Sequence, residues 1–357
     1  MSAADRLIQS LSLTDTDGVV ILDPSNVRYF SGGFTGEGAL FITKGRRVLL
    51  TDSRFTHEAA ARCADFEVLE RDARMSDSRL IASLCRACGM ESLFYEDDAM
   101  TVRAYRHLKD RVDGSVSLHA LGRRHTALRC VKQPEEIACI RRACTASSLA
   151  FERLLEELRP GQTEQEVALR LRQLMLEHGG DALSFPVMAA SGPNSVLCHA
   201  QPTARRLQRG DLITLDFGCR VNGYCADMTR TVALGQPAQE LQAMHEAVLQ
   251  TQQLCLGMIA PRQSCCDLDR LSRDTLMRCG YHNAFSHALG HGVGLDVHEP
   301  PVLSESCGDT LQTGMTLAVE PGVYVPGLGG VRIEDTVLVT DSGCEVLTNA
   351  TRELICV

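Results

Sequence analysis

The segment HALGHGVGLDVHEPP, residues 287–301, gathers three histidines whose type and spacing suit metal or substrate binding. His287, His291 and His298 lack the arrangement of a zincin, in which two histidines four residues apart on a helix enclose a glutamate. Glycines surround His291, and glycines at this density weaken a helix. We therefore expect a glycine-rich strand or loop whose backbone allows a close approach to another group.

Two further segments each combine an apolar strand, a glycine-bearing turn and a second strand, with an acid in each strand. Asp216 and Asp227 lie in DLITLDFGCRVNGYCADMTRTVAL, and Glu320 and Glu334 lie in TLAVEPGVYVPGLGGVRIEDTVLVT. Apolar residues alternate with Asp216 and Glu320, so these strands are expected to be buried. An unpaired ion inside a protein costs several kcal/mol, and the four acids therefore need partners.

Basic side chains are the first alternative for neutralising these acids. Arg332 stands two residues before Glu334 on the same expected strand face, but one arginine cannot serve four carboxylates. Arg230 is expected to point away from Asp227, because side chains alternate along a strand. A pair of divalent ions about 3.5–4 Å apart needs several carboxylates and usually a histidine, for which His291 is the natural candidate. The sequence therefore favours a dinuclear metal site over structural ion pairs.

These residues and their motifs resemble the metal site of the pita-bread metallopeptidases, peptidase family M24. The matching motifs are LDFG, ADMTRT, GHGVG, VEPGVY and VRIEDT. Within the family the chain is similar to the Xaa-Pro aminopeptidase (aminopeptidase P) and prolidase branch, because a domain precedes the motifs and SGPNSVLCHA resembles a substrate-contacting segment of Xaa-Pro peptidases. Creatinase shares the two-domain layout but lacks the metal ligands, so that branch is not expected.

The resemblance implies an Xaa-Pro peptidase that hydrolyses the bond between an N-terminal residue and proline with a hydroxide that bridges two divalent metal ions. Mn²⁺ is the first choice because the ligands are mostly oxygen atoms, and Co²⁺ or Zn²⁺ are alternatives. By resemblance, Asp216 would bind one ion, Asp227 and Glu334 would bridge both, and His291 and Glu320 would complete the second.

The resemblance also implies roles around the metals. Glu320 would carry a proton to the proline nitrogen, and His199 and His298 would contact the substrate and stabilise the oxyanion. His287 is expected at the proline pocket. Arg332 is expected among the substrate-binding residues and beside a carboxylate ligand that it would orient.

Several alternatives stay open. A strict Xaa-Pro dipeptidase needs a basic group for the C-terminal carboxylate of its substrate, and the sequence does not identify one. A non-catalytic pita-bread binding module would have lost metal ligands, whereas this chain has all five. For Phe185, His287 and Tyr324, a place in the core is the alternative to lining the substrate pocket.

The elements that must position these residues divide the chain into two domains. Residues 1–125 alternate short apolar strands with helices, as expected for a smaller α/β domain of the creatinase type. Residues 126–357 would form the pita-bread catalytic domain, so the fold class is expected to be α+β. Pro134 begins a helix, and Thr163 with Glu166 forms the capping box of the next one. Helices are also expected over residues 238–256 and 267–278, and strands over 211–218, 224–234, 316–325 and 331–340.

Composition excludes several classes of protein. The 357-residue chain has a net charge of −9 and no long basic run, which argues against nucleic acid or anionic membranes as partners. No apolar stretch is long enough to span a bilayer and no signal-peptide pattern begins the chain, so we expect a cytoplasmic protein. The 16 cysteines, including Cys85 and Cys88, are expected to be free thiols. Proline-containing peptides remain as expected partners, and the resemblance implies a homodimer.

Overall fold

A computed structural model describes residues 1–72 and 76–357. The chain divides into two compact units, Met1–Arg129 and Cys130–Val357. The expected boundary after residue 125 falls inside helix α6 (Arg124–Cys130), and the chain passes into the second unit where this helix ends.

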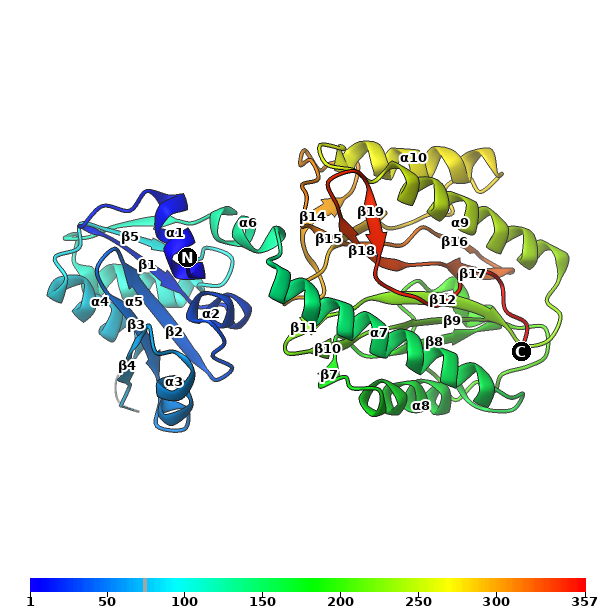
Figure 1. Ribbon diagram of the computed structural model, residues 1–357, viewed down its shortest axis with the longest axis horizontal. Helices are drawn as coiled ribbons and strands as arrows, with labels where there is room; N and C mark the ends of the chain where they lie inside the picture. The colour runs from blue at the N-terminus through cyan, green and yellow to red at the C-terminus, as the bar shows by residue number, and fades with distance from the viewer. Residues whose placement is uncertain (73–75) are drawn as a thin grey trace. The chain divides into compact units, whose positions relative to one another are not determined.

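The first unit is built on a six-stranded sheet in the order β4-β3-β2-β1-β5-β6. β2 is antiparallel to β1 and β3, and the other neighbouring strands are parallel. Helices follow most strands, which confirms the expected α/β type (Figure 1). The strands are β1 (Asp17–Ile21), β2 (Gly38–Thr43), β3 (Arg47–Thr51), β4 (Glu67–Glu70), β5 (Ser92–Tyr95) and β6 (Ser117–Ala120). The helices before α6 are α1 (Ala3–Leu11), α2 (Pro24–Ser31), α3 (Thr56–Arg62), α4 (Asp77–Ala87) and α5 (Val102–Val112).

The cysteine pair of the first unit belongs to its core. Cys85 on α4 is buried in an apolar cluster, and Cys88 packs against the same cluster from the end of the helix. Both are free thiols, as the sequence predicted.

The second unit places two helix pairs around small antiparallel sheets. Figure 1 shows α7 and α8 on one side of the strands and α9 and α10 on the other. The helices are α7 (Pro134–Glu157), α8 (Glu164–Glu177), α9 (Gln239–Met258) and α10 (Cys265–Arg278), with the 3₁₀ turn η1 at Gly192–Val196. One sheet has the order β12-β9-β8, and another has the order β14-β13-β15-β18-β19. Their strands are β8 (Met188–Ser191), β9 (Leu212–Phe217), β12 (Met228–Ala233), β13 (Gly290–Gly292), β14 (Glu299–Leu303), β15 (Thr316–Val319), β18 (Asp335–Val339) and β19 (Cys344–Val346).

Two smaller sheets are formed mainly by the segments that connect the strands of the two larger sheets. β10 (Cys219–Val221) pairs with β11 (Tyr224–Cys225) and with β7 (Ala182–Leu183), and β16 (Gly322–Val325) pairs with β17 (Gly329–Arg332). The main core cluster lies between α7, α8 and the sheet of β9, where Phe151 stacks on Phe217 with ring centroids 6.0 Å apart. The two units together give the expected α+β class.

Local sequence signals set the helix starts of the second unit. Pro134 is the first residue of α7, and Gln133 with Glu136 forms a capping box there. The predicted capping box of Thr163 and Glu166 is present at α8. These signals act within one turn of helix, which is why the sequence alone located them.

The strands that carry the acids are shorter than the sequence predicted. The expected strand 316–325 is broken after Val319, because Pro321 has no amide N–H for a ladder and Glu320 N donates to Leu289 O at 2.8 Å. The expected strand 331–340 is broken before Asp335, where Glu334 N donates to Thr229 O. Arg332 and Glu334 therefore do not share one continuous strand, although both side chains hydrogen-bond to Thr229 Oγ1.

Candidate metal centre and active site

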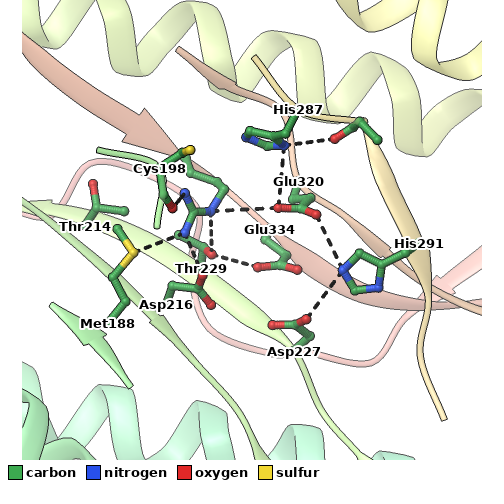
Figure 2. Close-up of polar contacts among 12 residues, drawn as sticks. Met188, Cys198, Thr214, Asp216, Asp227, Thr229, His287, His291, Glu320 and Glu334 are labelled. Atoms are coloured by element: carbon green, nitrogen blue, oxygen red, sulfur yellow. Dashed lines mark hydrogen bonds and ion pairs between the residues drawn. The ribbon is translucent and has the colours of Figure 1, made fainter. Parts of the chain in front are cut away.

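Four carboxylates and one imidazole converge in the second unit, from segments far apart in the sequence. Asp216 lies inside β9, Asp227 directly precedes β12, Glu320 directly follows β15, and Glu334 directly precedes β18. His291 is the middle residue of β13. Figure 2 shows the five side chains pointing toward one another from these strands.

The donor atoms of these residues are close enough to share cations. One ligand atom from each of Asp216, Asp227 and Glu334 lies within 4.8 Å of the others, and the same holds for His291, Glu320 and Glu334. His291 Nε2 is 3.5 Å from Glu320 Oε1 and 3.7 Å from Asp227 Oδ2. Glu334 belongs to both groups and Asp227 contacts His291, so these two acids connect the two halves of the cluster.

Burial, followed by charge repulsion between the carboxylates, shifts the pKa values of this cluster. Burial, followed by the neighbouring carboxylate of Glu334, raises the pKa of Asp227 and of Glu320 well above the usual range. Burial and the nearby Asp216 raise the pKa of Glu334 to about 8. Burial also lowers the pKa of His291 to about 4, so its imidazole is neutral and keeps a nitrogen lone pair for a ligand.

Two glycines allow His291 to reach the cluster. A Cβ atom on Gly290 would lie 1.9 Å from Ala318 O, and one on Gly292 would lie 2.4 Å from Pro300 O. Real side chains do not approach backbone oxygens so closely, and β13 could not sit between β14 and β15 with larger residues at these positions.

The donor set fits divalent cations better than structural ion pairs. Arg332 donates to Asp216, but the carboxylates of Asp227 and Glu334 contact no lysine or arginine side chain in the described parts of the chain. Asp216 Oδ1 is buried without a hydrogen-bond partner among the described residues. Buried carboxylates with one neutral imidazole form an oxygen-rich set that suits hard or borderline divalent ions.

A hydrogen-bonded chain runs from the acids to the predicted proline-pocket histidine. Arg332 Nη2 donates to Asp216 Oδ2 at 2.6 Å, and Nη1 donates to Tyr324 Oη at 2.7 Å. Tyr324 Oη in turn lies 2.8 Å from His287 Nε2. Arg332 also donates to Thr229 Oγ1 and its side chain is 2% exposed, so its contacts favour orienting Asp216 over binding substrate directly.

The remaining predicted substrate residues line one cavity with the five ligands. This cavity has a volume of about 520 Å³, and its walls include His199, His287, His298 and Phe185. The His298 ring stands edge-to-face against His291, with centroids 4.4 Å apart. His287 also packs edge-to-face on Phe285, so it both lines the cavity and has the satisfied contacts of a core histidine.

Sequence reasoning missed two threonines that support the ligands. Thr229 Oγ1 donates to Glu334 Oε2 at 2.7 Å, and Thr336 Oγ1 donates to Asp227 O at 2.7 Å. Each threonine follows the acid of its own segment by two residues, in DMT and EDT, yet each one holds the acid of the other segment. The repeated acid-x-threonine spacing was the available signal.

Comparisons with known proteins agree with this geometry. A sequence model of the metallopeptidase family M24 matches residues 138–341, and a creatinase/prolidase N-terminal domain matches residues 4–131. The uncharacterized peptidase YqhT of Bacillus subtilis (strain 168) is 36% identical over 340 residues, which cover 95% of each protein.

Solved structures resemble the whole chain. The Xaa-Pro dipeptidase from Bacillus anthracis superposes with a TM-score of 0.94 at 33% identity and covers 99% of both chains. The X-Pro aminopeptidase from Thermotoga maritima MSB8 has a TM-score of 0.89 at 32% identity and covers 98% of this chain and 100% of its own. With its motifs, its two domains and its full length matched, this chain belongs to the metallopeptidase family M24.

Proposed function

We propose that this metallopeptidase cleaves Xaa-Pro peptides between the N-terminal residue and proline. The single observation that carries the proposal is the convergence of Asp216, Asp227, His291, Glu320 and Glu334 on one cavity. The two solved relatives described above are named for Xaa-Pro cleavage, one as a dipeptidase and one as an aminopeptidase, and this supports the choice of substrate.

Two divalent ions would be held by these five residues, with Mn²⁺ as the first choice and Co²⁺ or Zn²⁺ as alternatives. Asp216 would bind one ion, His291 and Glu320 the other, and Asp227 and Glu334 both, in keeping with the positions of Asp227 and Glu334, each in two of the three ligand groups. When bound, such ions supply a water of lowered pKa and polarise the scissile carbonyl.

The side chains of the protein would handle the proton and the substrate. Glu320 faces the cavity beside His291 and would carry the proton to the leaving proline nitrogen. His199 and His298 would donate hydrogen bonds to the carbonyl oxygen as negative charge develops on it. Arg332 would keep Asp216 in place, and His287 would form part of the wall around proline.

Release of the first amino acid from Xaa-Pro and Xaa-Pro-Yaa peptides by the Mn²⁺-loaded enzyme tests the proposal. Turnover is expected with both peptides, and matched Xaa-Ala peptides serve as the control. Cleavage of Xaa-Pro alone would identify the strict dipeptidase. No turnover with any proline peptide would overturn the proposal.

The catalytic role of Glu320 is tested by Glu320→Gln. This variant should fold normally and lose turnover by more than about a hundredfold, because general acid–base catalysis contributes about 10²–10⁴-fold. Full activity would assign the proton transfer to another group. Metal analysis of the wild type separates an enzyme from a binding module, since a non-catalytic module would hold no stoichiometric pair of ions.

The resemblance also supports a homodimer that acts on proline-containing peptides, and a cytoplasmic location stays part of the proposal. Light scattering after size-exclusion chromatography would measure the oligomeric state. Within the described residues, every helix is too short or too polar to cross a bilayer.

A further inference from the structure

Lys132 and Glu299 form a buried ion pair that the proposed mechanism does not use. Lys132 Nζ lies 2.6 Å from Glu299 Oε1, and the two side chains are 1% and 5% exposed. Charges removed from water lose hydration, so a buried ion pair often stabilises a fold no more than an apolar pair of similar size. The function of the pair must therefore be sought in the segments that it joins, because its contribution to the free energy of folding does not explain it.

Glu299, the acidic partner, packs against the loop of residues 293–298, which ends in His298. Glu299 follows His298 directly and begins β14. A Cβ atom on Gly294 would meet Glu299 Oε1 at 2.4 Å, so the loop backbone passes closely over this carboxylate. Elsewhere the loop is held by Cys225, whose N–H donates to Gly294 O at 2.7 Å.

The basic partner is itself fixed by the backbone. Lys132 N donates to Gly314 O at 2.9 Å, and Lys132 Nζ also donates to Cys130 O at 3.2 Å. Cys130 Sγ donates to Pro300 O at 3.2 Å. The segment before α7 thus contacts both residues that follow His298, one through an ion pair and one through a thiol.

His298 is the group that this arrangement would place. Its ring lines the cavity and stands against His291 at an interplanar angle of 81°. We propose that the Lys132–Glu299 pair is a positioning pair, which holds the loop so that the His298 imidazole meets the substrate beside the metal ligands. The activity assays for this inference rest on the proposed function, whereas a crystal structure of the variant tests it without turnover.

The main test replaces both charges, in Lys132→Met/Glu299→Met, because either single change leaves a buried charge unpaired and strongly destabilises the fold. The double variant should fold and bind two Mn²⁺ ions per chain like the wild type. Its kcat/KM on Xaa-Pro peptides should fall by about ten- to hundredfold, the usual effect of losing a partner that orients a functional side chain.

Coupling to His298 distinguishes positioning from general support of the fold. His298→Ala should reduce kcat/KM strongly in the wild type but by less than about twofold in the double variant, because groups that act through one another are not additive. Equal factors in both backgrounds, or wild-type activity in the double variant, would overturn the proposal. Arg141→Met, which removes an exposed ion pair with Glu345, is the control and should leave kcat/KM unchanged.

A crystal structure of the Mn²⁺-loaded double variant supplies a readout that is independent of turnover. The His298 ring should move from its edge-to-face contact with His291. An unchanged ring position overturns the inference whatever the activity. If the wild type itself cleaves no proline peptide, the proposed function fails, while the ring position still tests the role of Lys132 and Glu299.

Discussion

The two halves of the catalytic unit build their acids on the same strand plan. In the first half β9 pairs antiparallel with β12, and in the second half β15 pairs antiparallel with β18. A short hairpin interrupts each pair, β10 with β11 and β16 with β17. In both halves one acid lies within one residue of the end of the outgoing strand, and the other lies directly before the returning strand.

The halves differ in the strand that pairs with the other edge of the outgoing strand, which is β8 beside β9 and β13 beside β15. β8 places Met188 opposite Asp216 in the first half, whereas β13 of the second half carries the ligand His291 opposite Ala318. Only β13 has glycines on both sides of its functional residue, and both are required by close backbone contacts. The shared plan therefore supplies carboxylates twice, and one modified strand supplies the imidazole.

The halves are also held together by crossed contacts. Arg332 of the second half donates to Asp216 of the first, and Arg230 of the first half donates to Glu334 O and Asp335 Oδ1 of the second. Arg332 thus contacts the side-chain carboxylate of Asp216, a predicted metal ligand. Arg230 instead contacts the backbone carbonyl of Glu334 and the carboxylate of its neighbour Asp335. This difference predicts that the two arginines serve different purposes.

The largest effect is expected from removing the equivalent acids, Asp227 and Glu334. Asp227→Asn and Glu334→Gln should each lose at least one metal ion and reduce kcat/KM by more than about a thousandfold, since single groups that stabilise transition-state charge are already worth about 10²–10³-fold. Metal analysis and peptide kinetics measure both. Glu345→Gln, at an exposed ion pair, is the control. Two ions and normal turnover in either variant would show that the halves are not equivalent.

Substitutions of the two arginines should have smaller effects, one on activity and the other on stability. Arg332→Met should lower kcat/KM by about ten- to hundredfold with little change in stability of the loaded enzyme. Arg230→Met should instead lower the free energy of unfolding by about 3 kcal/mol, because it takes one of the cations from the fully buried Asp335. Urea unfolding measures the stability of both variants, and peptide kinetics measure their kcat/KM. The same pattern in both variants would contradict the distinction.

The smallest effect concerns pH and the metal-free protein. The pKa of Glu334 is about 8 in the fold against 4.5 for the free side chain, so the folded protein holds a proton that the unfolded chain has lost. The stabilisation that Glu334 contributes through this proton is complete below pH 4.5 and is lost as the pH rises to about 8. For one proton, the free energy of unfolding falls by at most about 1.4 kcal/mol per pH unit.

The clearest window for this measurement lies above pH 6.5, the ordinary pKa of histidine, because His287 and His291 have pKa values lowered to about 4 and are neutral there in both states. Between pH 6.5 and 8 the metal-free protein should therefore lose stability as the pH rises. Bound Mn²⁺ should reverse this trend, because metal binding requires deprotonated ligands. Glu334→Gln should reduce the metal-free slope without abolishing it, because Asp227 and Glu320 also have raised pKa values. A flat slope in the wild type would contradict the raised pKa values.

Much of this architecture could be predicted from the sequence because its signals are local. Proline at the start of α7, the capping box of α8 and the short apolar runs of the first unit each act over a few residues. The acids and His291 were identifiable because buried carboxylates without basic partners require another source of positive charge. Cys85 and Cys88 were expected to be free thiols, and both are.

Other features depend on residues that meet only in the folded chain. The breaks at Glu320 and Glu334 arise from hydrogen bonds to Leu289 and Thr229, which no periodicity along the strands contains. The crossed threonine and arginine contacts, and the pairing of Lys132 with Glu299, likewise join segments distant in sequence.

The sequence by itself determined which side chains can carry the chemistry, since residue type and short spacing decide what a group can bind or ionise. Only the tertiary structure decided how those groups are oriented and supported. Orientation depends on distances between separate segments of backbone, and those distances are set by the packing of the whole unit.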